Sequence, residues 1–454
     1  MIRGAAMNPE KRGGDDPAPA SASFRARALL RRCCRHRCGP VDGHACDQPQ
    51  RPEYAPVREP GSLLARGPLG ARLQQRLNEI TGATVTHNNS VQLLVDGVQS
   101  YAAMLELVER AQHEILFENF IFRSDAIGSA FADSLRRRGE DGVHVQVLHD
   151  AFGSLMSLRT PIGFRFHQSP VEVRVYNPPR PSLDFFRAGR DHRKLIVQDR
   201  RRIVLGGMCV ADMWLGNCVT TCTWRDSTVG IDGDAAADAA ATFEPMWAQG
   251  RSFTPHRSGR YRAVELPTCT HPAGSVPVRV IADEPRALRT ERTLVAVFDA
   301  AESEILITNP YVILPDSLTT ALSAAVARGV VVRILTPRFS NHHWVGLSAE
   351  HRFGRLLDSG VEIWRWLGPL IHAKTVVVDR CWSLVGSTNL DPLSLWRNAE
   401  INVEIQGARF GDQLTDLFLH DLQTSEPFTS AQWRSRRPFR RWVTHAATLG
   451  WQWQ

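Results

Sequence analysis

Two histidines and two lysines occur at matching positions in two distant segments of this chain. Lys194 follows His192 by two residues, and Lys374 follows His372 by the same interval. In both segments an aspartate stands seven residues after the histidine and a glycine stands 14 residues after it, at Asp199, Gly206, Asp379 and Gly386. Because a histidine and a lysine two residues apart on a β-strand point to the same face, each segment presents an imidazole beside an ammonium group.

Two imidazoles and two ammonium groups around one pocket suit the transfer of a phosphoryl group. Ammonium groups neutralise phosphate oxygens, and the turn Gly386-Ser387-Thr388-Asn389 offers further donors to them. One imidazole can attack phosphorus while the other protonates the leaving oxygen, since histidine titrates near ~6.5 and serves in either role. A single histidine on a strand is more often a core residue, but two copies at matched spacing favour a catalytic site.

The use of lysine supports this interpretation. The chain contains only three lysines, at Lys11, Lys194 and Lys374, against 51 arginines. Genomic base composition accounts for the scarcity of lysine but not for the two that occupy the same position of both segments. An ammonium group is smaller than a guanidinium and differently hydrated, so its retention indicates a specific requirement for it.

The elements around the first motif predict alternating strands and helices. Strands are expected at Val91–Val95, Glu114–Glu118 and Val143–Leu148. Apolar residues three and four apart predict a helix after the first strand and a second helix before Gly139, on Tyr101, Met104, Leu105, Val108, Ile127, Phe131 and Leu135. This alternation is typical of an α/β layer structure with a mostly parallel sheet.

The second half of the chain repeats this order. The strand expected at Glu304–Thr308 resembles the one that begins 190 residues earlier, and a helix ending at Gly329 and a strand at Val330–Leu335 follow it. We therefore expect an α/β fold of two similar domains from an internal duplication, covering residues 71–260 and 261–454 and joined between Arg251 and Pro277. Residues 1–70 have no sustained apolar period and are expected to form a disordered basic tail.

Charge and composition narrow the classes of function. The 454 residues carry a formal net charge of +7, which favours a polyanionic partner such as nucleic acid, an acidic lipid surface or a phosphorylated substrate. No apolar run approaches the ~18–20 residues of a spanning helix, and no signal peptide is expected. Nine scattered cysteines, an odd number, suit reduced thiols in a cytoplasm. No set of metal ligands is evident, so we expect neither a metal nor a cofactor.

The paired H-x-K-x-x-x-x-D motif resembles that of the phospholipase D superfamily. Further stretches are similar to bacterial cardiolipin synthases, namely Glu118–Gly128, Asp150–Ser154, Arg190–Lys194, Trp224–Asp226 and Leu370–Glu400. The resemblance covers about residues 90 to 410. It implies two phospholipase D-like domains with the active site at their pseudo-twofold interface. Because no spanning helix is expected, the chain is more similar to the peripheral branch than to the branch with two N-terminal spanning helices.

The resemblance also implies a role for each motif residue. His192 would be the nucleophile that forms a phosphohistidine, and His372 the general acid and then the base. Phosphate oxygens would be bound by Lys194, Lys374, Ser387, Asn389 and Gly207. Glu400 would orient a catalytic imidazole from behind, with Asp226 as its counterpart for His192. Asp199 and Asp379 belong to the catalytic motifs but are expected to stabilise structure.

The implied activity is a phosphatidyl transfer that makes cardiolipin from phosphatidylglycerol-type lipids. The implied partners are anionic phospholipids at a membrane surface, with peripheral attachment to the cytoplasmic face of the bacterial inner membrane and no nucleic acid partner. Hydrolysis of the phospholipase D type, a nuclease or other phosphodiesterase activity, and a non-catalytic binding module remain alternatives, and the oligomeric state is open. One departure from the family is Cys209, where asparagine is usual, because a thiol is a poor hydrogen-bond donor.

An Arg- and Trp-rich segment follows Phe428 at the C-terminus. Arginine beside tryptophan suits an anionic lipid interface. A helix packed on the second domain with solvated arginines explains the composition equally well. The sequence is therefore compatible with a lipid-binding segment and with a packed helix.

Overall fold

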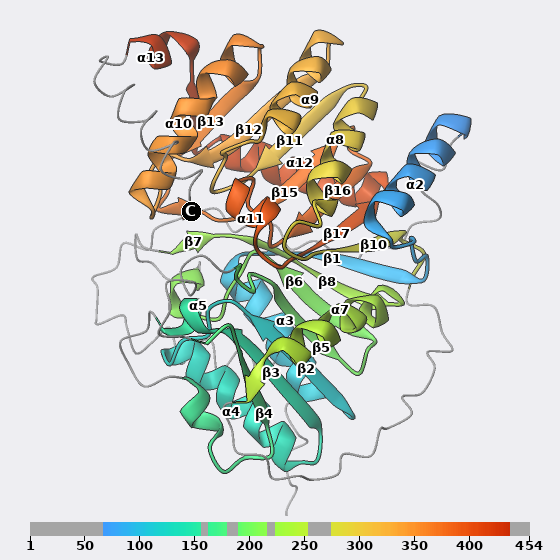
Figure 1. The fold of residues 1–454 in the computed structure, drawn as a ribbon, viewed down its shortest axis with the longest axis vertical. Coiled ribbons are helices and arrows are strands. Elements are labelled where there is room, and N and C mark those ends of the chain that lie inside the picture. Colours follow the sequence, from blue (N-terminus) through green and yellow to red (C-terminus); the bar gives the residue numbers. More distant parts are fainter. Residues whose placement is uncertain (1–66, 156–161, 179–188, 216–222, 253–273, 436–454) are drawn as a thin grey trace, which may run out of the picture.

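The computed structural model describes residues 67–155, 162–178, 189–215, 223–252 and 274–435. The predicted tail up to residue 66, most of the predicted domain junction and the C-terminal residues from 436 lie outside this described part. The domain boundaries therefore stay predictions. In Figure 1 the two halves of the chain stack along the long axis of the molecule, each built on one large sheet.

The sheet of the first half has eight strands in the order β1-β8-β6-β5-β2-β3-β4-β9. In chain order they are β1 (Asn89–Val95), β2 (Glu114–Asn119), β3 (His144–Asp150), β4 (Glu172–Tyr176), β5 (Lys194–Gln198), β6 (Arg202–Gly206), β8 (Ser227–Gly233) and β9 (Arg251–Ser252). Its helical elements are α3 (Asp96–Arg110), α4 (Ala126–Glu140), α5 (Ala151–Leu155), η2 (Ile162–Phe166), η3 (Asp212–Trp214) and α7 (Ala235–Gln249).

The sheet of the second half has the same plan, β10-β17-β16-β15-β11-β12-β13-β18. Its strands are β10 (Val278–Asp283), β11 (Glu304–Thr308), β12 (Val331–Pro337), β13 (Glu362–Trp366), β15 (Thr375–Val378), β16 (Trp382–Gly386), β17 (Glu400–Gln406) and β18 (Ser425–Phe428). Its helices are α8 (Arg289–Ala300), α9 (Asp316–Ala327), α10 (His343–Asp358), α11 (Pro392–Trp396), α12 (Ala408–Leu422) and α13 (Ser430–Arg434). The short strands β7 (Trp224–Arg225) and β14 (Leu370–Ile371) pair with each other across the halves.

The α/β fold and its duplication are confirmed, and the predicted strands are found within a few residues of their expected ends. The expectation of mostly parallel sheets is wrong. In the first sheet only β2-β3 and β3-β4 are parallel, and in the second only β11-β12 and β12-β13. The reason lies in the motif itself, because the three residues between β5 and β6 allow only a hairpin, and a hairpin is antiparallel.

Three clusters of buried apolar side chains hold the molecule together. Two belong to one half each, and the third contains residues of both sheets together with α7 and α12. This shared core joins the halves through the apolar faces that each would otherwise expose to water. The halves therefore pack as one body, with the edges that carry the motifs facing each other.

Helix α2 (Gly67–Thr81) crosses from the start of the described chain to the second half. In Figure 1 this blue helix lies beside α8 rather than beside its sequence neighbours of the first half. Leu77 is completely buried in the cluster of the second half, and Leu73 and Ile80 pack against that cluster. The last residues of the predicted tail, from Gly67 on, are thus part of this helix.

At the C-terminus, the described part of the Arg- and Trp-rich segment packs against the protein. The Trp433 indole donates to the carbonyl of Glu350 at 3.0 Å, and Arg434 pairs with Asp358 at 2.6 Å. For these residues the packed helix is the correct interpretation. The remainder of the segment lies outside the described residues.

Candidate active site

The two lysines lie at the same end of two equivalent central strands, one in each sheet. Lys194 is the first residue of β5 and lies opposite Asn119 at the end of β2, while Lys374 immediately precedes β15. Each histidine lies two residues before its lysine and just outside the strand, where a side chain can turn into the interface. His192, Lys194, His372 and Lys374 are all buried, with 8%, 1%, 6% and 4% of their surface exposed.

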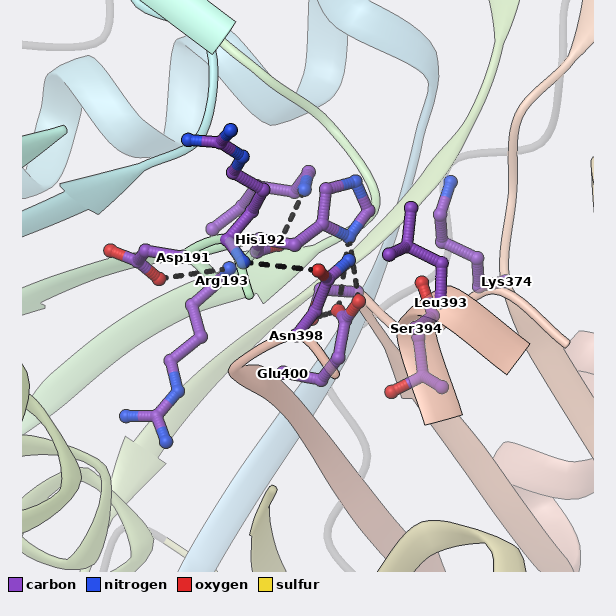
Figure 2. Close-up of polar contacts among 12 residues, drawn as sticks. Asp191, His192, Arg193, Lys374, Leu393, Ser394, Asn398 and Glu400 are labelled. Atoms are coloured by element: carbon purple, nitrogen blue, oxygen red, sulfur yellow. Dashed lines mark hydrogen bonds and ion pairs between the residues drawn. The ribbon is translucent and has the colours of Figure 1, made fainter. Parts of the chain in front are cut away.

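Each histidine is bound by a carboxylate from the opposite half. Nδ1 of His192 lies 2.9 Å from Oε1 of Glu400, and Nδ1 of His372 lies 2.7 Å from Oδ2 of Asp226. Figure 2 shows Glu400 meeting His192 from the second half. The two carboxylates were expected, but the pairing of Asp226 with His192 was wrong. Sequence order suggests a partner within the same half, whereas the interface exchanges the partners.

The backbone explains why the pairs cross. The His192 N–H donates to the carbonyl of Ala399 at 2.9 Å, and the His372 N–H donates to the carbonyl of Arg225 at 2.7 Å. These two carbonyls belong to the residues that precede Glu400 and Asp226. Each carboxylate segment therefore runs beside the histidine segment of the other half, which brings its side chain to Nδ1 of that histidine.

The two carboxylates accept hydrogen bonds from different side chains. The Ser387 hydroxyl donates to Glu400 at 2.5 Å and also receives the Ile401 N–H. In the first half Gly207 stands at the corresponding motif position, and the Trp214 indole donates to Asp226 at 3.0 Å instead. Ser387 was expected to bind phosphate, but it is completely buried and its hydroxyl is engaged by Glu400.

Gly207 has a steric reason to be glycine. A Cβ atom at this position would lie 2.6 Å from Oδ1 of Asp226 and 3.1 Å from Cδ of Lys374. The absence of a side chain lets Asp226 and Lys374 approach each other. The predicted contact of Gly207 with phosphate stays a prediction.

Aromatic rings cover both imidazoles. The ring of Phe120 meets His192 edge-on at 4.9 Å between centroids, and Lys194 Nζ lies 5.3 Å from the same ring. Trp214 and Trp224 lie 5.5 and 5.2 Å from His372. Phe120 and Trp214 were missed by sequence reasoning, because an isolated aromatic residue next to a strand gives no signal beyond that of a core residue.

Burial keeps both imidazoles neutral. It lowers the pKa of His192 well below its ordinary value, with Lys194 and Lys374 adding to the effect. Burial and then Lys374 lower the pKa of His372 to about 3, against the opposing effect of Asp226. A neutral imidazole whose Nδ1–H donates a hydrogen bond to a carboxylate carries a lone pair on Nε2. Each histidine can therefore act as a nucleophile or a base through Nε2.

The other ionisable groups of the site differ between the halves. Burial raises the pKa of Glu400 to about 7. Burial acts in the same direction on Asp226, but His372 and then Lys374 outweigh it and lower the pKa of that carboxyl group. Burial also lowers the pKa of Lys374 to about 7, where Asp226 opposes the shift and Lys194 adds to it. Asp226 is thus the more acidic of the two carboxylic acids.

The third motif residues lie away from the site. The Asp199 carboxylate, beyond the far end of β5, accepts from the backbone N–H groups of Gln112, His113 and Glu114 at 2.8–2.9 Å. Asp379 holds the start of β11 in the same way, through the N–H groups of Glu302, Ser303 and Glu304 at 2.7–2.9 Å. Both carboxylates therefore tie a hairpin to the start of a neighbouring strand, which is the structural role expected of them.

Asn389 and Cys209 occupy equivalent motif positions. Oδ1 of Asn389 is buried and has no hydrogen-bond partner within the described residues. Because an amide oxygen only accepts, the group of Asn389 that suits a phosphate oxygen is its NH2 donor. Cys209 is buried, and burial raises the pKa of its thiol, while its carbonyl accepts from the Tyr101 hydroxyl at 2.7 Å. The first half therefore has no amide donor at this position.

Comparison with known proteins decides the family. Residues 294–422 match the family model described as "Cardiolipin synthase, PLD-like domain". A cardiolipin synthase of Oceanobacillus iheyensis is 31% identical over 350 residues, which cover 76% of this chain and 71% of that protein. The chain belongs to the cardiolipin synthase family. Cardiolipin synthase A of Pseudomonas aeruginosa is 30% identical over 391 residues, 86% of this chain and 78% of its own length.

Membership of the cardiolipin synthase family places the chain among the phosphatidyltransferases of the phospholipase D superfamily, as the paired motifs predicted. A solved phosphatidylserine synthase of Haemophilus influenzae has the same fold, with a TM-score of 0.63 and 14% identity over 84% of this chain and 99% of that one. Within the described residues, no helix is long and apolar enough to cross a membrane.

Proposed function

We propose that the protein is a cardiolipin synthase that transfers a phosphatidyl group between two phosphatidylglycerol-type lipids through a phosphohistidine. The observation that carries this proposal is the crossed pair of imidazoles, each with a carboxylate at Nδ1 and each beside a lysine ammonium group. Such a pair supplies two Nε2 atoms and the positive charge that a phosphodiester requires.

In the first step Nε2 of His192 attacks phosphorus and forms a P–N bond. The bond from phosphorus to the glycerol oxygen of the donor breaks, and that oxygen takes a proton from His372. The bound phosphodiester is an anion, so it raises the pKa of the neighbouring imidazoles and allows His372 to carry this proton. Asp226, the more acidic carboxyl group, stabilises the resulting imidazolium, which favours His372 as the acid.

In the second step the acceptor lipid enters with a free glycerol hydroxyl. The now neutral His372 removes the hydroxyl proton, the oxygen attacks phosphorus, and the P–N bond to His192 breaks. The products are cardiolipin and the glycerol released in the first step. Lys194, Lys374 and the Asn389 amide hold the phosphate oxygens, where positive charge is worth most because water is largely excluded.

Phosphatidylglycerol vesicles labelled with ³²P test the reaction. Purified protein is expected to form labelled cardiolipin, whereas phosphatidic acid as the main product would indicate hydrolysis and overturn the transfer. The intermediate is trapped by quenching in alkali, in which a phosphohistidine survives. His167→Gln, at an exposed histidine outside the site, serves as the matched control and should retain both label and turnover.

A donor with a p-nitrophenol leaving group assigns the two histidines, because such a leaving group needs no protonation. His372→Gln should still acquire label from this donor and lose it slowly, while His192→Gln should acquire none. The opposite result would exchange the two roles.

The proposal includes work at a membrane surface, on the cytoplasmic face of the bacterial inner membrane. Strands β11, β12 and β13 are parallel, and β15 runs antiparallel to them, so their carboxyl ends lie near Lys374, which immediately precedes β15. Phe339 follows β12 there and is 71% exposed, and Leu367 follows β13 and is 48% exposed. These side chains, with the net charge of +7, suit contact with an anionic lipid surface.

Sedimentation with phosphatidylglycerol vesicles tests this surface. Phe339→Ser should weaken binding and lower turnover on vesicles, but not on a short-chain donor dissolved in water. Phe164→Ser is the matched control, since Phe164 is 55% exposed on η2, next to α4. Equal loss of binding in both variants would remove the role given to Phe339.

A further inference from the structure

Arg225 and Asp421 form a buried ion pair that joins the two halves beside the active site. Nη2 of Arg225 lies 2.7 Å from Oδ2 of Asp421, and the side chains are 5% and 1% exposed. Arg225 belongs to β7 of the first half, and Asp421 lies in the last turn of α12 of the second half. Nη1 of Arg225 also donates to the Ser227 hydroxyl.

The segment that carries Arg225 holds His372 at two points. The carbonyl of Arg225 accepts the His372 N–H at 2.7 Å, and the next residue, Asp226, binds Nδ1 of the same histidine at 2.7 Å. The parallel pairing of β7 with β14 continues this contact along the chain. A shift of β7 would therefore disturb both the backbone and the ring of His372.

The corresponding segment of the other half is held differently. Ala399 occupies the position equivalent to Arg225, because its carbonyl accepts the N–H of His192. Its neighbour Asn398 accepts the Arg190 N–H at 3.1 Å through the side-chain oxygen. Alanine has no charge to pair, so the ion pair supports only the segment beside His372.

Stability alone is a weak reason to keep such a pair. Removing two charges from water costs several kcal/mol per ion, and apolar replacements of similar volume are often as stable or more stable. Burial lowers the pKa of Arg225, but the negative charges of Asp421 and then Asp96 outweigh burial and raise this pKa. The guanidinium therefore remains charged. Asp96 also accepts the Asp226 N–H at 3.0 Å, which leaves β7 fixed from both sides.

We propose that Arg225 is a positioning residue whose ion pair with Asp421 fixes β7, and thereby holds the Asp226 carboxylate against Nδ1 of His372. The inference rests on the proposed function only for its kinetic readout. The charged groups that act on His372 are Asp226, Lys374 and Lys194, and the variants below leave all three in place.

The test compares two buried ion pairs. Asp421→Asn removes the charge next to the site with little change of shape. Glu404→Gln removes the equivalent charge from the Arg279–Glu404 pair, whose atoms are 2.5 Å apart and whose side chains are completely buried between β10 and β17. Both variants should lower the melting temperature. Only Asp421→Asn should lower kcat, by about 10-fold or more, with KM within about twofold of the wild-type value.

The pH profile and NMR give readouts that a purely structural role would not move. A loosened contact with Asp226 lowers the pKa of His372, so the basic limb of the kcat profile of Asp421→Asn should move to lower pH. ¹⁵N-histidine NMR, assigned with His372→Gln, should show loss of the Nδ1–H tautomer of His372. The NMR measurement needs no turnover, so it tests the effect of the ion pair on His372 even if phosphatidyl transfer is not the activity.

A second variant covers the case in which Asp421→Asn does not fold. Arg225→Met/Asp421→Leu replaces the pair with apolar side chains and should remain folded. It is expected to show the same loss of kcat and of the Nδ1–H tautomer. A wild-type tautomer and pH profile in either folded variant would overturn the proposal.

Discussion

Replacing Lys374 with arginine keeps a cationic side chain at this position but changes the shape of the cation. Nζ of Lys374 donates to the His372 carbonyl at 2.5 Å and lies 3.0 and 3.1 Å from the two ring nitrogens. The side chain is buried, and its Cδ comes within 3.1 Å of the position that a Cβ at Gly207 would take. A larger, planar guanidinium at this position would therefore press against His372 or Gly207.

The size of the effect follows from the place of this cation. A guanidinium forced into the site would move the His372 ring or the bound phosphate by a sizeable fraction of an ångström, and displacements of this order are costly in catalysis. Loss of one well-placed donor to a developing oxyanion costs ~2.7–4 kcal/mol. We therefore expect Lys374→Arg to lower kcat by about 100-fold to 1,000-fold. The fold should survive, because a cationic side chain is kept and the residues of β15 are untouched.

Steady-state formation of labelled cardiolipin, measured beside the thermal melt, checks this expectation. Lys11→Arg is the matched control, since Lys11 is the third lysine of the chain and lies outside both motifs. It should behave as the wild type. Turnover near the wild-type level in Lys374→Arg would refute the reasoning, and would mean that the two motif lysines were retained by chance in a chain with 51 arginines.

Three further predictions concern the neighbours of this cation. Ser387→Ala removes the hydroxyl that donates to Glu400 at 2.5 Å, so kcat should fall by about 10-fold with KM nearly unchanged, and an unchanged kcat would contradict this role. Gly207→Ala places a Cβ 2.6 Å from the Asp226 carboxylate, so turnover should fall below about 1% of wild type while the protein still melts cooperatively; full activity would show that the site relaxes. The pKa of His372 is about 3 in the folded protein and about 6.5 in the unfolded chain, so the unfolded state binds more protons between these values and stability falls as the pH drops through this range. The melting temperature of His372→Gln should therefore fall less than that of the wild type between pH 6.5 and pH 4, and parallel curves would contradict the shift.

The motif residues could be predicted from the sequence because their spacing is repeated. The interval between His192 and Lys194 recurs between His372 and Lys374, and a strand translates that interval into one shared face. The same periodicity predicted the strands and helices of both halves. It did not predict strand direction, which is set by the short turn after β5 that closes a hairpin.

The hydrogen bonds that hold the two carboxylates in place could not be predicted from one sequence. The Ser387 hydroxyl donates to Glu400, and the Trp214 indole takes the corresponding place on Asp226. Both contacts depend on how separate segments meet after folding. A hydroxyl after a glycine turn has several possible partners, and spacing does not choose among them.

Because the two halves exchange carboxylates, neither copy of the duplicated motif forms a complete site by itself. His192 depends on Glu400 of the second half, and His372 depends on Asp226 of the first half. If each motif had its own carboxylate, either half could lose contact with the other and keep an oriented imidazole. With crossed pairs, separation of the halves would leave both histidines without the group that fixes their tautomer. The shared apolar core and the Arg225–Asp421 pair therefore bear directly on the chemistry, because they hold together a site that neither half contains alone.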